Sequence, residues 1–169
     1  MRCPFKKDEP DKIVMMEKRG KLRKRIRRLI ILFIVCLVLS GVTAFPIETE
    51  LKILNATISS DWINKVYLAV KSTNDNYPYL SYGTDWLAFA HLVIAVAFIG
   101  PLRNPLKNIW VIEFGMIACL MVFPLAFIAG PIRGIPFYWQ LIDCSFGASG
   151  FALLYYCYRN ILELEKISK

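Results

Sequence analysis

Four ionisable side chains lie inside apolar stretches of this chain, where a charge without a partner or water is costly: Asp85, His91, Glu113 and Asp143. These groups are the first candidates for chemistry. A carboxylate beside a histidine orients the imidazole ring, and histidine gains or loses its proton near neutral pH. A His–Asp pair could therefore hold a ligand, relay a proton or act as an acid and base.

The spacing of His91 and Asp143 predicts that they lie at a similar depth. His91 follows Asp85 by about 9 Å of helix, and Asp143 follows Pro136 by about 10 Å, at 1.5 Å per residue. Their segments are expected to cross a membrane in the same direction, so a hydrogen bond between them is geometrically allowed. Three further polar side chains would rim the same outer-leaflet pocket: Asp85, Gln140 and Arg133.

These five side chains are our predicted ligand-binding residues, and His91 with Asp143 would be the catalytic pair if the protein is an enzyme. Asp85 is the poorer partner for His91, because the two lie about 120° apart around a helix. Glu113 is expected in the opposite leaflet. We predict an ion pair between Glu113 and Arg103 there, with a functional carboxylate as the alternative.

Motifs that would identify a reaction are missing. The chain has no Gly-rich phosphate loop, no His-Glu-x-x-His helix and no Gly-x-Ser-x-Gly elbow. Its single histidine excludes a bis-histidine haem within one monomer, and its five cysteines form no Cys-x-x-Cys pair. We therefore expect no metal and no cofactor.

Four apolar segments must position these side chains: 29–45, 85–102, 109–130 and 137–158. Segments of this length span the hydrocarbon core of a bilayer, which is about 30 Å thick, although the first does so only just. With 56% hydrophobic residues, the chain is too apolar for a soluble domain of its size. We predict an all-α polytopic membrane protein, a bundle of four transmembrane helices with a short outer amphipathic helix.

Charge sets the predicted orientation. Residues 1–28 form a basic tail with 12 Lys and Arg against 4 Asp and Glu, and the remaining residues carry 9 of each. The loop at 103–108 and the tail at 159–169 are also basic, whereas the outer segments at 46–84 and 131–136 are balanced or short. The positive-inside rule then places both termini in the cytoplasm. Lipid headgroups explain the basic tail better than nucleic acid does.

The first apolar segment has a second interpretation as a signal peptide. Val42-Thr43-Ala44 has the small-x-small pattern of a cleavage site after a basic region and an apolar region. The basic region is long for a signal peptide, and Pro46 follows the cleavage site closely, so we favour a membrane anchor. Cleavage would remove one helix without reversing the other three.

Helical spacing identifies three further features. The outer segment should contain a helix over about 59–71, with Ser60 as N-cap and an apolar face made by Trp62, Ile63, Val66, Tyr67 and Val70. The fourth apolar segment has a stripe of polar and small residues: Gln140, Asp143, Gly147 and Gly150. The second has a matching stripe: Thr84, Ala88, His91 and Ala95. Small residues let helices approach closely in a membrane.

Several stretches resemble small, uncharacterised four-helix proteins of the bacterial inner membrane: residues 82–91, 110–115, 130–136 and 141–147. The resemblance covers roughly the last half of the chain. It implies a location in the bacterial inner membrane and no particular activity.

These observations leave three hypotheses about function. The favoured one is a non-catalytic module that binds a lipid, a quinone-like molecule or a partner helix in the outer-leaflet pocket. The second is a membrane enzyme acting on a lipid or isoprenoid with His91 as acid and base. The third is an oligomeric transporter or proton path. The expected partners are membrane lipids, with a second copy of the chain or another membrane protein, and not nucleic acid.

Overall fold

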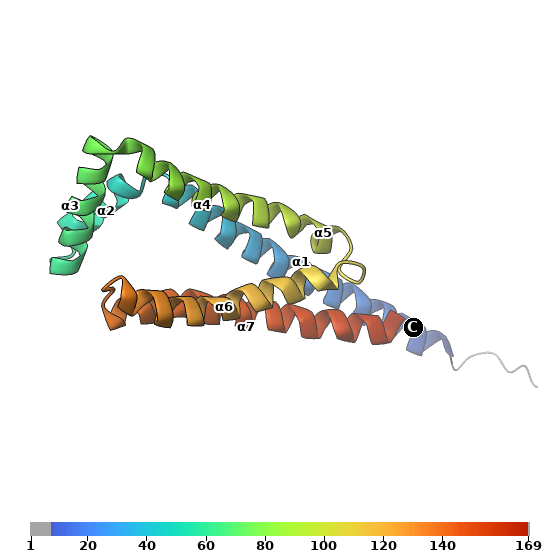
Figure 1. The fold of residues 1–169 in the computed structure, drawn as a ribbon. Helices are drawn as coiled ribbons and strands as arrows, with labels where there is room; N and C mark the ends of the chain where they lie inside the picture. Colours follow the sequence, from blue (N-terminus) through green and yellow to red (C-terminus); the bar gives the residue numbers. More distant parts are fainter. Residues whose placement is uncertain (1–7, 169) are drawn as a thin grey trace, which may run out of the picture. The chain divides into compact units, whose positions relative to one another are not determined.

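The computed structural model describes residues 8–168, and every regular element in that range is a helix. The helices in chain order are α1 (Asp8–Ala44), α2 (Ile47–Thr57), α3 (Asp61–Asn76), α4 (Pro78–Ala97), α5 (Ile99–Arg103), α6 (Ile109–Ile132) and α7 (Phe137–Ser168) (Figure 1). The chain divides into two units. The first unit holds the residues up to Phe33 and from Phe98 onward, and the second holds Ile34–Ala97. The two units are described separately below.

Prolines set two of the helix ends. A proline has no N–H, and its ring clashes with the carbonyl four residues earlier, which favours a helix end before that point, although α6 continues through Pro124 and Pro131. Pro46 follows the end of α1 at Ala44, and α4 ends at Ala97, four residues before Pro101. The second apolar segment, predicted as one helix, is therefore interrupted at Phe98 before the short helix α5.

The outer segment is more helical than expected. The helix predicted at about 59–71 is present as α3, which begins after Ser60 as predicted and continues to Asn76. Ser60 makes no side-chain capping bond, however. The helix α2 was not expected, and α4 begins at Pro78 rather than at Asp85.

The predicted apolar face of α3 is confirmed. Ile63 is buried, and the other four residues of that face are at least partly covered: Trp62, Val66, Tyr67 and Val70. Leu68, which helical periodicity places outside this face, is 54% exposed. The 3.6-residue repeat therefore identified the inner side of α3 from local sequence alone.

In the first unit, α6 and α7 lie side by side (Figure 1). The predicted small-residue stripe of α7 makes this contact. A Cβ atom added at Gly147 would come within 2.8 Å of the Cys119 backbone oxygen, and one at Gly150 within 2.9 Å of the Cys119 Sγ. Both distances are shorter than real Cβ contacts, and at Gly147 the neighbouring atom belongs to the backbone, so a larger residue there would force the two helices apart.

The apolar core of the first unit joins α1, α5, α6 and α7. Its fully buried side chains include Ile26, Ile30, Phe98, Ile112, Leu154 and Ile161. The ring of Phe98 lies 4.6 Å from that of Phe33, centroid to centroid. Gly115 lies against Phe98 and Leu154. A Cβ atom added at Gly115 would come within 2.7 Å of a carbon atom of each of these side chains. The N-terminal half of α1 is therefore packed into this unit through its apolar side.

In the second unit, the rest of α1 contacts α4 through Gly41. A Cβ atom there would meet the Ala88 backbone oxygen at 2.8 Å and the Cβ of His91 at 3.1 Å. The helices α2, α3 and α4 are joined by polar side chains. Asn74 of α3 donates to a Glu48 carboxylate oxygen of α2 at 2.6 Å and accepts a hydrogen bond from Ser81 of α4.

Within the part of the chain that the structure describes, three helical stretches are long and apolar enough to cross a membrane: Lys12–Ala44, Pro78–Arg103 and Ile109–Ile132. In the most apolar part of each, only 22%, 22% and 17% of the residues are buried by the rest of the chain. The helix α7 is not among them, because Gln140, Asp143 and several tyrosines lower its mean hydropathy. The fourth span at 137–158 therefore stays a prediction.

Candidate functional site

His91 lies in α4 and is partly buried. Its Nδ1 atom is 2.9 Å from the carbonyl oxygen of Leu87, one helical turn earlier. Because a carbonyl can only accept, Nδ1 carries the hydrogen in this contact, and a neutral ring then keeps Nε2 as an acceptor. The helix backbone thus selects the tautomer with the hydrogen on Nδ1. In that tautomer, Nε2 can accept a hydrogen bond from another group.

Asp143 lies in α7 and is also partly buried. It belongs to the first unit, whereas His91 belongs to the second, and the predicted hydrogen bond between them stays a prediction. Each of the two predicted stripes has a partner helix within its own unit. Ala88 of the α4 stripe faces α1, and Gly147 of the α7 stripe faces α6.

The three predicted rim residues differ in their surroundings. Gln140 is buried, and its Nε2 donates to the carbonyl oxygen of Ile135 at 2.8 Å. Its side chain also packs on Gly130, where an added Cβ atom would meet the Gln140 amide carbon at 2.7 Å. Arg133 is exposed at the end of α6, and Asp85 is partly buried in α4. The amide nitrogen of Gln140 is thus used to hold the turn between α6 and α7.

That turn is a Schellman motif. The Ile135 N–H donates to the Gly130 carbonyl at 2.9 Å, and the Gly134 N–H donates to the Pro131 carbonyl at 3.1 Å. Gly134 has φ +67°, a left-handed conformation that glycine adopts without strain. The motif reverses the chain in a few residues, so α7 returns directly along α6.

Glu113 lies in α6 and is partly buried. Among the residues that the structure describes, the two ion pairs join Lys18 to Glu163 and Lys21 to Glu17. The pairing of Glu113 with Arg103 therefore stays a prediction. Arg103 itself is exposed and lines a pocket at the end of α5.

The sequence alone did not predict this pocket, because the basic tail indicates only an orientation and a general attraction to lipid headgroups. It has a volume of about 210 Å³, and three arginines line it: Arg23 and Arg27 of α1 and Arg103 of α5. The spacing of Arg23 and Arg27, four residues apart, indicates that they share one face of a helix. No local pattern indicates that Arg103 joins them.

Other residues of the basic segment contact α7. The Lys18 Nζ lies 2.7 Å from a Glu163 carboxylate oxygen, and Arg25 donates to the Tyr156 hydroxyl at 3.0 Å. Arg19 donates to the Ser168 hydroxyl at 2.8 Å. The Lys18 hydrogen bond, followed by its charge, lowers the pKa of the Glu163 carboxyl below its ordinary value. The basic segment from Lys12 onward is therefore part of a long helix that is docked on its own chain.

No protein-family model, no curated protein and no solved structure matches this chain. Within residues 8–168, no group of three or more His, Cys, Asp or Glu side chains could hold a metal ion. The function is therefore argued from the side chains described above.

Proposed function

We propose that this protein is a non-catalytic, multi-pass membrane module whose apolar helix faces bind lipid or a partner helix. The observation that carries the proposal is the low burial of the three membrane-length stretches within the chain. An apolar surface of this extent must be covered by something other than water. Lipid chains cover it in a membrane, and a second copy or another membrane protein would cover part of it.

The polar side chains in the apolar helices support a non-catalytic role. His91 bonds the Leu87 carbonyl, Ser145 donates to the Ile142 carbonyl and Ser149 donates to the Phe146 carbonyl. Each bond stays within one helix, which is how a polar group is accommodated where water is scarce.

We propose that α7 is the fourth span. Its small residues lie against α6, which is itself of membrane length, and the contact continues from Gly130 near the turn to Gly115 at the other end. A helix that packs alongside a spanning helix over this length lies at the same depth in the bilayer. Gln140 is satisfied by the Ile135 carbonyl, which lowers the cost of its burial.

Reporter fusions test the number of spans and the orientation. A reporter active only in the cytoplasm, joined after Lys169, should be active, and one placed in the segment 46–84 should be inactive. Both termini then lie in the cytoplasm, as the basic segments predict, and the bacterial inner membrane is the proposed location. An inactive reporter after Lys169 would show three spans and contradict the proposal for α7.

Native mass spectrometry of the purified chain tests the binding function. We expect the purified chain to retain phospholipid or to form a stable oligomer, because its apolar helix faces are unfavourable in water. Protein that retains neither lipid nor another chain would contradict the proposal. His91→Ala tests whether Nε2 of His91 contacts the bound molecule, with Ser149→Ala as a control at another polar side chain that bonds its own helix.

A further inference from the structure

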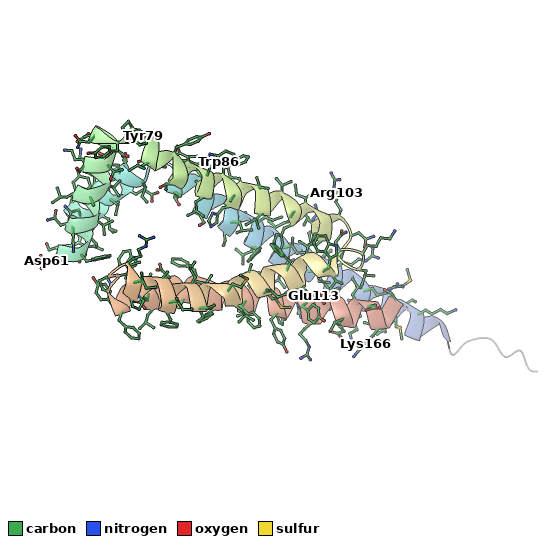
Figure 2. The ribbon with its side chains drawn as sticks, in the orientation of Figure 1. Asp61, Tyr79, Trp86, Arg103, Glu113 and Lys166 are labelled. Carbon is green, nitrogen blue, oxygen red and sulfur yellow. The ribbon has the colours of Figure 1, made fainter. Side chains whose placement is uncertain are left out.

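The arginine pocket brings together positive charges that are far apart in the sequence. Arg23 and Arg27 lie one turn apart on α1, and Arg103 is the last residue of α5 (Figure 2 labels Arg103). Asn104 lines the same hollow, and its side-chain oxygen accepts a hydrogen bond from the Lys107 backbone N–H at 3.2 Å. That bond holds the loop after α5 in place beside the arginines.

The residues that line the pocket include no carboxylate. The ion pairs between described residues use Lys18 and Lys21, and neither pair involves a pocket arginine. Three like charges around one hollow repel one another unless an anion lies between them. The floor of the pocket is apolar, with Ile26 and Leu164 almost completely buried, and this strengthens the attraction for a bound charge.

Phosphate is the anion that this arrangement suits best. A guanidinium donates two parallel hydrogen bonds to phosphate oxygens, and its charge persists at any physiological pH. Three such groups can neutralise a phosphate from several directions. We propose that this pocket binds the phosphate group of an anionic ligand, with Arg23, Arg27 and Arg103 as its donors.

The position and size of the pocket agree with a small headgroup. Arg27 lies two residues before the apolar run that begins at Leu29, and Arg103 immediately follows the apolar segment at 85–102. In a membrane, both positions fall at the level of the lipid phosphates. The volume of about 210 Å³ is below that of pockets for drug-sized molecules, which run from about 300 Å³. The site does not involve His91 and stands independently of the proposed function.

Two sources could supply the phosphate: the headgroup of an anionic phospholipid or a soluble phosphate ester. The test uses the full-length protein in detergent and measures binding by native mass spectrometry. One arm adds phosphatidylglycerol, with phosphatidylcholine for comparison, and the other adds glycerol 3-phosphate. Saturable binding in the first arm assigns the site to lipid, and binding in the second arm alone assigns it to a soluble ester.

Arg27→Gln and Arg103→Gln each remove one donor, and each should weaken binding about tenfold in the arm that shows it. The matched control is Arg28→Gln, which removes the same charge from the neighbouring position outside the pocket lining. It should change binding less than twofold. Equal weakening by Arg27→Gln and Arg28→Gln would show diffuse attraction to a basic helix and overturn the proposal, as would the absence of binding in both arms. Circular dichroism and size-exclusion elution establish that each variant is folded.

Discussion

The helix pairs α6–α7 and α2–α3 are joined in different ways. Between α6 and α7, glycine lies against backbone: a Cβ atom added at Gly147 would come within 2.8 Å of the Cys119 carbonyl oxygen. Between α2 and α3, side-chain hydrogen bonds accompany the contacts of the apolar face of α3. Asn55 donates to Asn64 at 3.3 Å, and Asn74 donates to Glu48 at 2.6 Å.

This difference indicates different surroundings for the two pairs. In hydrocarbon, apolar side chains gain nothing by leaving lipid for another helix, so association depends on close packing of small residues. At an aqueous surface, side-chain amides and carboxylates remain solvated, and their hydrogen bonds add modest stability. The α6–α7 pair therefore suits the proposed span of α7, and the α2–α3 pair suits the proposed position of the outer segment at the membrane surface.

The largest effect should come from the α6–α7 contact. Gly147→Ala would force the two helices apart, because the new Cβ atom would lie 2.8 Å from the Cys119 carbonyl oxygen. We expect a loss of about 1–3 kcal/mol in the free energy of unfolding. Titration of the reconstituted protein with a denaturing detergent, followed by circular dichroism, measures this loss.

Gly83→Ala is the matched control, since Gly83 lies in α4 with nothing within 4 Å of its added Cβ atom. Alanine is the better helix former, so this variant should be unchanged or more stable by up to about 1 kcal/mol. Equal destabilisation by the two variants would show that the close contact of α6 with α7 is not what holds the pair together.

A smaller loss should follow from Gln140→Leu. This change removes the donor to the Ile135 carbonyl in the turn that joins α6 and α7, and we expect a loss of about 1 kcal/mol. The same detergent titration measures it. Ser145→Ala, which removes an exposed hydroxyl bonded within α7, should cost less than about 0.5 kcal/mol. A larger loss for Ser145→Ala than for Gln140→Leu would contradict the role of Gln140.

In the α2–α3 pair, Asn74→Ala should have the main effect, because Asn74 contacts both Glu48 of α2 and Ser81 of α4. We expect a local loss of about 0.5–1 kcal/mol, measured as faster amide hydrogen exchange in α2 and α3. Asn55→Ala removes only an exposed bond and should change exchange less. Unchanged exchange after Asn74→Ala would show that apolar contacts alone join these helices.

The smallest effect concerns pH and the docking of α1 on α7. The pKa of Glu163 is lowered in the folded protein by the Lys18 hydrogen bond and charge. A lowered folded pKa stabilises the folded state above the ordinary value of 4.5, and this contribution is lost as the pH falls through the folded value. The protection factors of amides near Lys18, which correct for the intrinsic pH dependence of exchange, should therefore fall slightly on acidification below pH 4.5, and Glu163→Gln should remove this dependence. The same fall in the Glu163→Gln protein would contradict this assignment.

Local sequence determined the helices and the inner face of α3. The repeat of Trp62, Ile63, Val66, Tyr67 and Val70 predicts which side is covered, because helical geometry depends only on neighbours within one or two turns. The same reasoning missed α2, whose apolar positions are interspersed with Glu48, Glu50 and Lys52. It also began α4 at Asp85, although Pro78 is well placed to start a helix.

Only the tertiary structure decided which surfaces meet. Within its own unit, the α7 stripe of small and polar residues packs on α6, and the α4 stripe packs on α1. Likewise, the sequence shows Arg23 and Arg27 on one helix face but gives no sign that Arg103 lines the same pocket. Helical periodicity indicates which face of a helix carries apolar or small residues. The partner of that face depends on the fit of surfaces far apart in the chain, which local sequence does not contain.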